Sequence, residues 1–168
     1  MPDSGEEPDS DDTDTQTNTD SGDCASDEIL QPQTNRCWRR CPVGQEWVDS
    51  VCVGSVSFRN WSGAVSACPA ASSKYRTATR DEMISVLDNC DPNIVQSNID
   101  GLCDPCAQSS YCFQMFEFDS YVYWTSTATE PDSDTQAMPW GVSFAIGTVF
   151  QSYNNEELHA ARCLRNID

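Results

Sequence analysis

Ten cysteines are the residues of this chain with the most evident chemistry. Four of them lie in its middle part, and thiolates at such spacings can bind zinc tetrahedrally: Cys90, Cys103, Cys106 and Cys112. An even and dense set of cysteines in a chain of 168 residues is more typical of an exported domain closed by disulfides. We therefore expect these four cysteines to form disulfides in a pairing that the sequence leaves open, with a zinc site as the alternative.

The single histidine, His159, is the candidate general base. A catalytic histidine needs an aligned nucleophile or a carboxylate that orients its ring, and no such sequence signature surrounds His159. We predict that it lies at a solvated strand end, that the chain has no catalytic residue, and that it is not an enzyme.

Acidic residues dominate the charge of the chain. It has 27 acids and 9 bases, a formal net charge of −18, and such a field repels nucleic acid phosphates and anionic lipids. Residues 1–28 contain eleven of the acids and no base, so the remainder has a net charge of −7. We predict a disordered acidic tail and linker over residues 1–34 and a single folded domain over residues 35–168.

The chain has no run of apolar residues long enough to form a transmembrane segment. Its first residues also lack the pattern of a secretory signal, although the cysteines indicate export. We therefore expect an extracellular or cell-surface protein whose signal has been removed, with a lipid anchor ahead of an acidic stalk as a further hypothesis. The oligomeric state stays open.

Two helices and a set of late strands should position these groups. One helical face over residues 60–68 contains Trp61, Ala64, Val65 and Cys68. A second helix begins at the capping box of Thr79 and Glu82 and ends near Asp91. Strands are predicted over 121–127, 140–145, 148–152 and 160–165, which gives an α+β fold with an antiparallel sheet.

Several motifs resemble known families. The long-form C-type lectin frame is similar to Cys41-Pro-Val-Gly-Gln-Glu-Trp47, Cys52, Trp61-Ser-Gly-Ala-Val-Ser-Ala-Cys68 and Cys163. A narrower resemblance is to the bacterial Lcl C-terminal domain, which ends the collagen-like adhesins. It covers Tyr75-Arg-Thr-Ala-Thr-Arg-Asp-Glu-Met83, Tyr123-Trp-Thr-Ser-Thr127, Trp140-Gly-Val-Ser-Phe-Ala-Ile-Gly-Thr-Val149 and Ala161-Arg-Cys-Leu-Arg165. The chain departs from that family at Arg76-Thr-Ala-Thr79, where members have Arg-Leu-Pro-Thr.

The resemblance implies a C-type-lectin-like fold with two helices and a small twisted antiparallel sheet that carries long, disulfide-stapled loops. It also implies that Cys41 pairs with Cys52, and that Cys68 on the first helix pairs with Cys163 on the last strand. Elimination then leaves Cys24 and Cys37 as a further pair near the domain entrance.

Glu130-Pro-Asp132 is similar to the loop with which sugar-binding C-type lectins hold calcium, and Asp134 adds a nearby acceptor. Those lectins complete the site with a Trp-Asn-Asp motif, whereas Trp140 is followed here by Gly141 and Val142. We therefore expect an ordinary polar loop and no cofactor, with calcium at Glu130, Asp132 and Asp134 as the alternative.

The resemblance implies a secreted or surface-tethered adhesin that binds a glycan or a protein on another surface. Loops carrying aromatic and amide side chains suit such contacts, so we expect the ligand to contact Glu130, Asp132, Asp134, Trp140, Tyr153, Asn154, Asn155 and Glu156. The alternatives are a hydrolase or another enzyme on the same scaffold, and a purely structural protein of the cell envelope.

Overall fold

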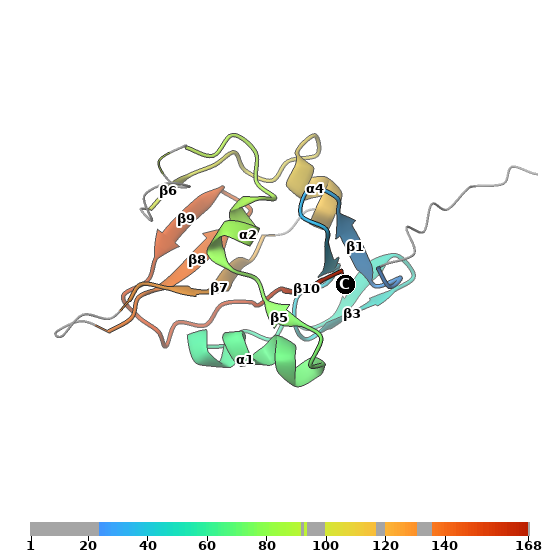
Figure 1. Ribbon diagram of the computed structural model, residues 1–168, viewed down its shortest axis with the longest axis horizontal. Helices are drawn as coiled ribbons and strands as arrows, with labels where there is room; N and C mark the ends of the chain where they lie inside the picture. The colour runs from blue at the N-terminus through green and yellow to red at the C-terminus, as the bar shows by residue number, and fades with distance from the viewer. Residues whose placement is uncertain (1–23, 92, 94–99, 117–119, 131–135, 168) are drawn as a thin grey trace, which may run out of the picture.

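The computed structural model describes residues 24–91, 93, 100–116, 120–130 and 136–167 (Figure 1). These residues form an α+β structure with three short helices, two four-stranded antiparallel sheets and one two-stranded hairpin. None of the helices in this part of the chain has the length and apolarity needed to cross a lipid bilayer. The predicted disorder of residues 1–23 lies outside the described residues.

The first sheet joins the two ends of the folded part. Its strands are β1 (Glu28–Gln31), β2 (Arg36–Arg39), β10 (Cys163–Asn166) and β5 (Arg76–Thr77), in the order β1-β2-β10-β5. Trp38 of β2 lies opposite Leu164 of β10, and both side chains are fully buried. Because β1 pairs along its whole length with β2, the folded part begins before residue 35, the predicted start of the domain.

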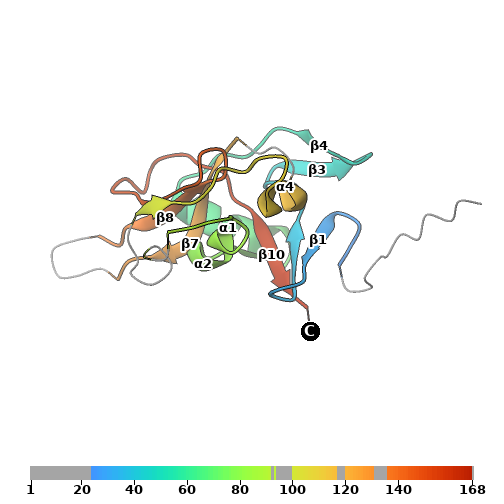
Figure 2. The same cartoon turned by 90° about the horizontal axis from the view of Figure 1, so that it is seen from above.

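The second sheet has the order β6-β9-β8-β7 and lies at the other end of the molecule (Figures 1 and 2). Its strands are β6 (Gly101–Leu102), β9 (Thr148–Gln151), β8 (Pro139–Ser143) and β7 (Val122–Ala128). Every residue of β8 is buried, which explains the mixture of aromatic and β-branched side chains there. The turn between β8 and β9 contains Gly147 at a φ of +67°, a conformation that favours glycine.

The described residues contain three helices, which pack beside the sheets. Helix α1 (Trp61–Ala71) is capped by Asn60, whose side chain accepts a hydrogen bond from the backbone N–H of Gly63, and it extends past the predicted end at residue 68. Helix α2 (Arg80–Ile84) has the predicted capping box of Thr79 and Glu82 but is shorter than expected. Helix α4 (Tyr111–Phe116) was not predicted.

The hairpin consists of β3 (Gln45–Val48) and β4 (Val51–Gly54). Its turn residues Asp49 and Ser50 both have positive φ, and the Cys41–Cys52 disulfide ties β4 to the segment that precedes β3. Figure 2 shows the hairpin at the margin of the molecule, with β4 on the outer side of β3.

All ten cysteines are paired in five disulfides. Cys68 of α1 and Cys163 of β10, which the resemblance pairs, are bonded with their Cα atoms 5.5 Å apart. The pairings that the sequence left open are Cys90–Cys103 and Cys106–Cys112. These four sulfur atoms form two disulfides and are not free thiolates, so the alternative of a zinc site made from them is wrong.

Candidate functional site

The loop that follows β9, residues 152–159, and the segment that precedes β8, residues 136–138, enclose the candidate binding site. Together they form an open pocket of about 380 Å³, which is lined by Gln136, Ala137, Met138, Tyr153 and Asn155. The pocket therefore combines an aromatic ring, two apolar side chains and two side-chain amides.

Tyr153 is the most unusual member of this site because 88% of its surface is exposed. An aromatic side chain in water presents a large apolar face, while its hydroxyl and the nearby amides of Gln136 and Asn155 can donate and accept hydrogen bonds. None of the described residues that line the pocket is charged. This arrangement suits an uncharged ligand that has an apolar face and polar groups at its rim.

Hydrogen bonds hold the loop at both of its ends. The backbone N–H of Ser152 donates to the carbonyl of Pro139 at 2.9 Å, and the Ser152 hydroxyl accepts from the N–H of Asn154 at 3.1 Å. The same hydroxyl contacts Oε2 of Glu157 at 3.2 Å. Tyr153 is therefore exposed on a backbone that the neighbouring polar groups already order.

Helix α1 supports the same loop from its N-terminus. The N–H of Trp61 donates to the carbonyl of Asn155 at 3.0 Å, and Nδ2 of Asn60 donates to Oε2 of Glu156 at 3.1 Å. Because the Cys68–Cys163 disulfide ties α1 to β10, the hydrogen bonds at the start of α1 connect this loop to a helix that is covalently held in the fold.

His159 is the last residue of this loop, and its side chain is not solvated as predicted. Its ring centroid is 4.6 Å from that of Trp124, and its Nε2 atom lies 3.4 Å from Oε2 of Glu157. Burial lowers the pKa of His159, and the nearby Glu157 carboxylate partly opposes this effect. The side chain is therefore largely buried rather than solvated, and it supports the loop that carries Tyr153.

The other residues that we expected to contact a ligand do not all lie at this pocket. Asn154 is exposed beside Tyr153, whereas Glu156 is directed to Asn60. Glu130 is exposed after the end of β7, and Asp132 and Asp134, the other two residues of the calcium hypothesis, lie outside the described residues.

The prediction that Trp140 contacts a ligand is wrong, because its side chain is only 1% exposed. It lies in the hydrophobic core, with the Arg80 guanidinium 4.4 Å from its ring centroid. Ala137 and Met138 take its place as the apolar part of the site, and sequence reasoning missed both. Their position directly before the strand predicted over residues 140–145 was the only available signal.

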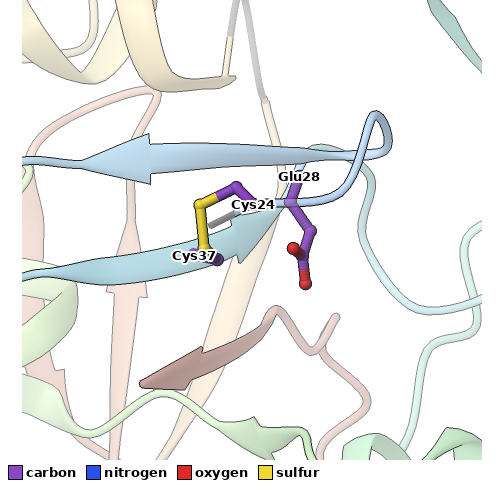
Figure 3. A group of neighbouring side chains, drawn as sticks. All are labelled: Cys24, Glu28 and Cys37. Carbon is purple, nitrogen blue, oxygen red and sulfur yellow. A yellow bond between two sulfur atoms is a disulfide. The ribbon is translucent and has the colours of Figure 1, made fainter. Parts of the chain in front are cut away.

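One group of potential metal ligands lies elsewhere in the described part of the chain. Atoms of Cys24, Glu28 and Cys37 lie within 4.8 Å of one another (Figure 3). The two sulfur atoms form a disulfide, and the Glu28 carboxylate accepts hydrogen bonds from Tyr75, Arg165 and the N–H of Ala25. These groups already occupy the ligand atoms, so the cluster is a structural anchor for β1.

Comparisons of the chain with models of protein families, with curated proteins and with solved structures found no significant match. What the chain does must therefore be inferred from the geometry and chemistry of its own residues. The Tyr153 pocket is the feature among the described residues whose exposure, apolar walls and amide groups together suit a ligand.

Proposed function

We propose that this chain is an exported binding module of C-type-lectin-like fold, similar to the Lcl C-terminal domain of bacterial collagen-like adhesins. The disulfide between the first helix and the last strand supports this assignment, as do the motifs that resemble that family. Five disulfides support an oxidising compartment and so a place outside the cytosol, in a secreted or surface-tethered protein.

The ligand of this module is a neutral glycan, and it binds at the Tyr153 pocket. The observation that carries the proposal is the exposure of the Tyr153 ring beside two amides on a loop that hydrogen bonds hold in place. The C–H face of a pyranose stacks on such a ring, and its hydroxyls form hydrogen bonds with Gln136 and Asn155. Anionic glycans are disfavoured, because the chain has a net charge of −18.

Calcium takes no part in the contacts that we assign to Tyr153, Gln136 and Asn155. A calcium ion held by Glu130, Asp132 and Asp134, the alternative drawn from the sequence, would make binding depend on calcium. Binding measured with added calcium and with a chelator distinguishes these two arrangements.

An array of neutral oligosaccharides tests the proposal when it is probed with the full chain and with three variants. We expect Tyr153→Ala to weaken binding of the recognised glycans at least tenfold, because the stacking ring is lost. Tyr153→Phe should retain most of the binding. Ile146→Ala, which removes another exposed apolar side chain, serves as the matched control and should leave binding unchanged.

Two results would overturn the proposal: no neutral glycan is bound, or the bound glycans are insensitive to Tyr153→Ala. Near-UV circular dichroism of each variant checks that the aromatic core is intact. Because Tyr153 is so exposed, we expect Tyr153→Ala to change the free energy of unfolding by less than about 0.5 kcal/mol.

A further inference from the structure

The β3–β4 hairpin has an apolar face that no described element covers. Val48, Val51 and Val53 are 43%, 51% and 40% exposed. Val48 lies directly opposite Val51 in the register, and Val53 is two residues further along β4, so the three side chains lie on one face. Glu46, directly opposite Val53, is the one charged residue of the hairpin strands on this face. Side chains alternate across a strand, so Trp47 and Cys52 lie on the other face.

The outer edge of β4 is also free among the described residues. The hairpin is a two-stranded sheet, so β4 pairs with β3 on one side and has no neighbouring strand on the other. A free edge presents unpaired backbone N–H and C=O groups, and proteins usually protect it with lysine, proline or a bulge. Residues 50–58 contain no charged residue and no proline, and the register along β4 is continuous.

Contacts on its covered face fix the conformation of the hairpin. Cys52 at the centre of β4 is bonded to Cys41, and the Arg40 guanidinium lies 4.9 Å from the ring centroid of Trp47. These contacts fix the covered face of the hairpin. A third strand that added to β4 would therefore lose little free energy in ordering the hairpin itself.

We propose that β4 is a docking edge for an extended segment of a partner protein, which adds to the hairpin as a third antiparallel or parallel strand. The segment has β-branched apolar residues at alternate positions, which pack beside Val51 and Val53, and basic residues at its ends. Backbone hydrogen bonds supply the affinity and the alternate side chains supply the specificity.

The charge of the chain favours a partner segment with basic ends over a second copy of the chain. The two charged residues of the hairpin, Glu46 and Asp49, are both acidic. The whole chain has a net charge of −18, so two copies repel one another while a segment with basic ends is attracted.

The docking edge is separate from the proposed glycan site. Figures 1 and 2 both show the hairpin and the sheet β6-β9-β8-β7, which precedes the Tyr153 loop, at opposite ends of the molecule. A partner strand on β4 therefore leaves the pocket open, and the chain would connect two ligands. The inference does not depend on the proposed glycan.

A display library of random nine-residue peptides, selected on the full oxidised chain, provides the test. We expect the enriched peptides to alternate β-branched and polar residues and to have lysine or arginine at their ends. The best peptide, synthesised with a fluorophore, should bind the chain in fluorescence polarisation. Methylation of its backbone nitrogens at every second residue should abolish binding in one of the two registers and not in the other, as strand addition requires.

Val53→Lys should weaken this peptide at least tenfold, because it replaces one of the apolar side chains beside which the segment packs with a charged one. Leu102→Lys, at an exposed position on β6, is the matched control and should have little effect. The proposal is overturned if no peptide is enriched, or if the enriched peptides tolerate methylation in both registers. It also fails if sedimentation shows a dimer that Val53→Lys dissociates, because the occupant is then a second copy.

Discussion

Glu28 provides the sharpest test of what holds this fold together. Its side chain is fully buried in the first sheet, where Nε and Nη2 of Arg165 each donate to its carboxylate at 2.8 Å. The Tyr75 hydroxyl and the N–H of Ala25 donate to the same group. Burial alone would raise the pKa of Glu28, but these hydrogen bonds outweigh it and lower the pKa from 4.5 to about 2.

The substitution Glu28→Gln removes the charge and keeps the size of the side chain. A fall of the pKa from 4.5 to about 2 corresponds to roughly 3 kcal/mol of stability at pH 7. Arg165 is partly exposed, and glutamine keeps some of the hydrogen bonds, so we expect a loss of about 2 to 3 kcal/mol. The contribution of Glu28 is fully present above its unfolded pKa and is lost as the pH falls toward 2.

Urea unfolding with the disulfides intact, followed by tryptophan fluorescence from about pH 7 to about pH 2, measures this difference. The two proteins should differ by about 2 to 3 kcal/mol at neutral pH and converge at the acid end. Glu46→Gln on the exposed face of β3 is the control and should change stability by less than about 0.5 kcal/mol. A loss that is equally large at pH 2, or no loss at pH 7, would refute the electrostatic argument.

Two further perturbations test the framework. Replacing Cys68 and Cys163 together by alanine should cost about 2 to 5 kcal/mol in urea unfolding, because the bond closes a loop with a sequence separation of 95 residues; an unchanged midpoint would contradict this role. Gly147→Ala should lower the thermal midpoint, because the residue has a φ of +67° and a Cβ would collide with the backbone of Cys103. Ile146→Ala beside it should have little effect.

Local signals predicted the beginnings of the helices better than their ends. Thr79 and Glu82 form their capping box within one turn of chain, so the start of α2 could be read from neighbouring residues. Beyond its end at Ile84 the chain makes contacts with distant segments instead of continuing the helix. The Asp88 side chain accepts a hydrogen bond from the N–H of Tyr111, and the Asp88 carbonyl accepts one from the N–H of Asp104. No periodicity in the sequence shows such contacts.

The first strand was missed because its composition resembles that of the acidic tail. Glu28 and Gln31 are both buried in β1, although their polarity indicates solvent. Each side chain is satisfied by partners far along the chain, since Glu28 pairs with Arg165 and Gln31 donates to Ser85. A buried polar residue is stable where hydrogen bonds replace its water, and these partners are known only once the sheet is formed.

The residues of the candidate site also differ in how far the sequence could predict their positions. Tyr153 and Asn155 could be selected from the sequence because aromatic and amide residues in a loop lie at the surface. Trp140 belongs to the same residue types, but a strand with neighbours on both sides places it in the core. Met138 became part of the site only through the packing of residues 136–138 beside the loop after β9.

Several of the few basic side chains make contacts inside the fold. Arg36 and Arg76 pair with Glu82, and Arg165 pairs with Glu28. Arg162 lies buried, where it donates to the carbonyls of residues 39 and 40 and to the Tyr123 hydroxyl. Because much of the positive charge is used in internal contacts, the outer field of the molecule stays acidic. The ligands that we propose, a neutral glycan at the Tyr153 pocket and a segment with basic ends at β4, are those that an acidic field does not repel.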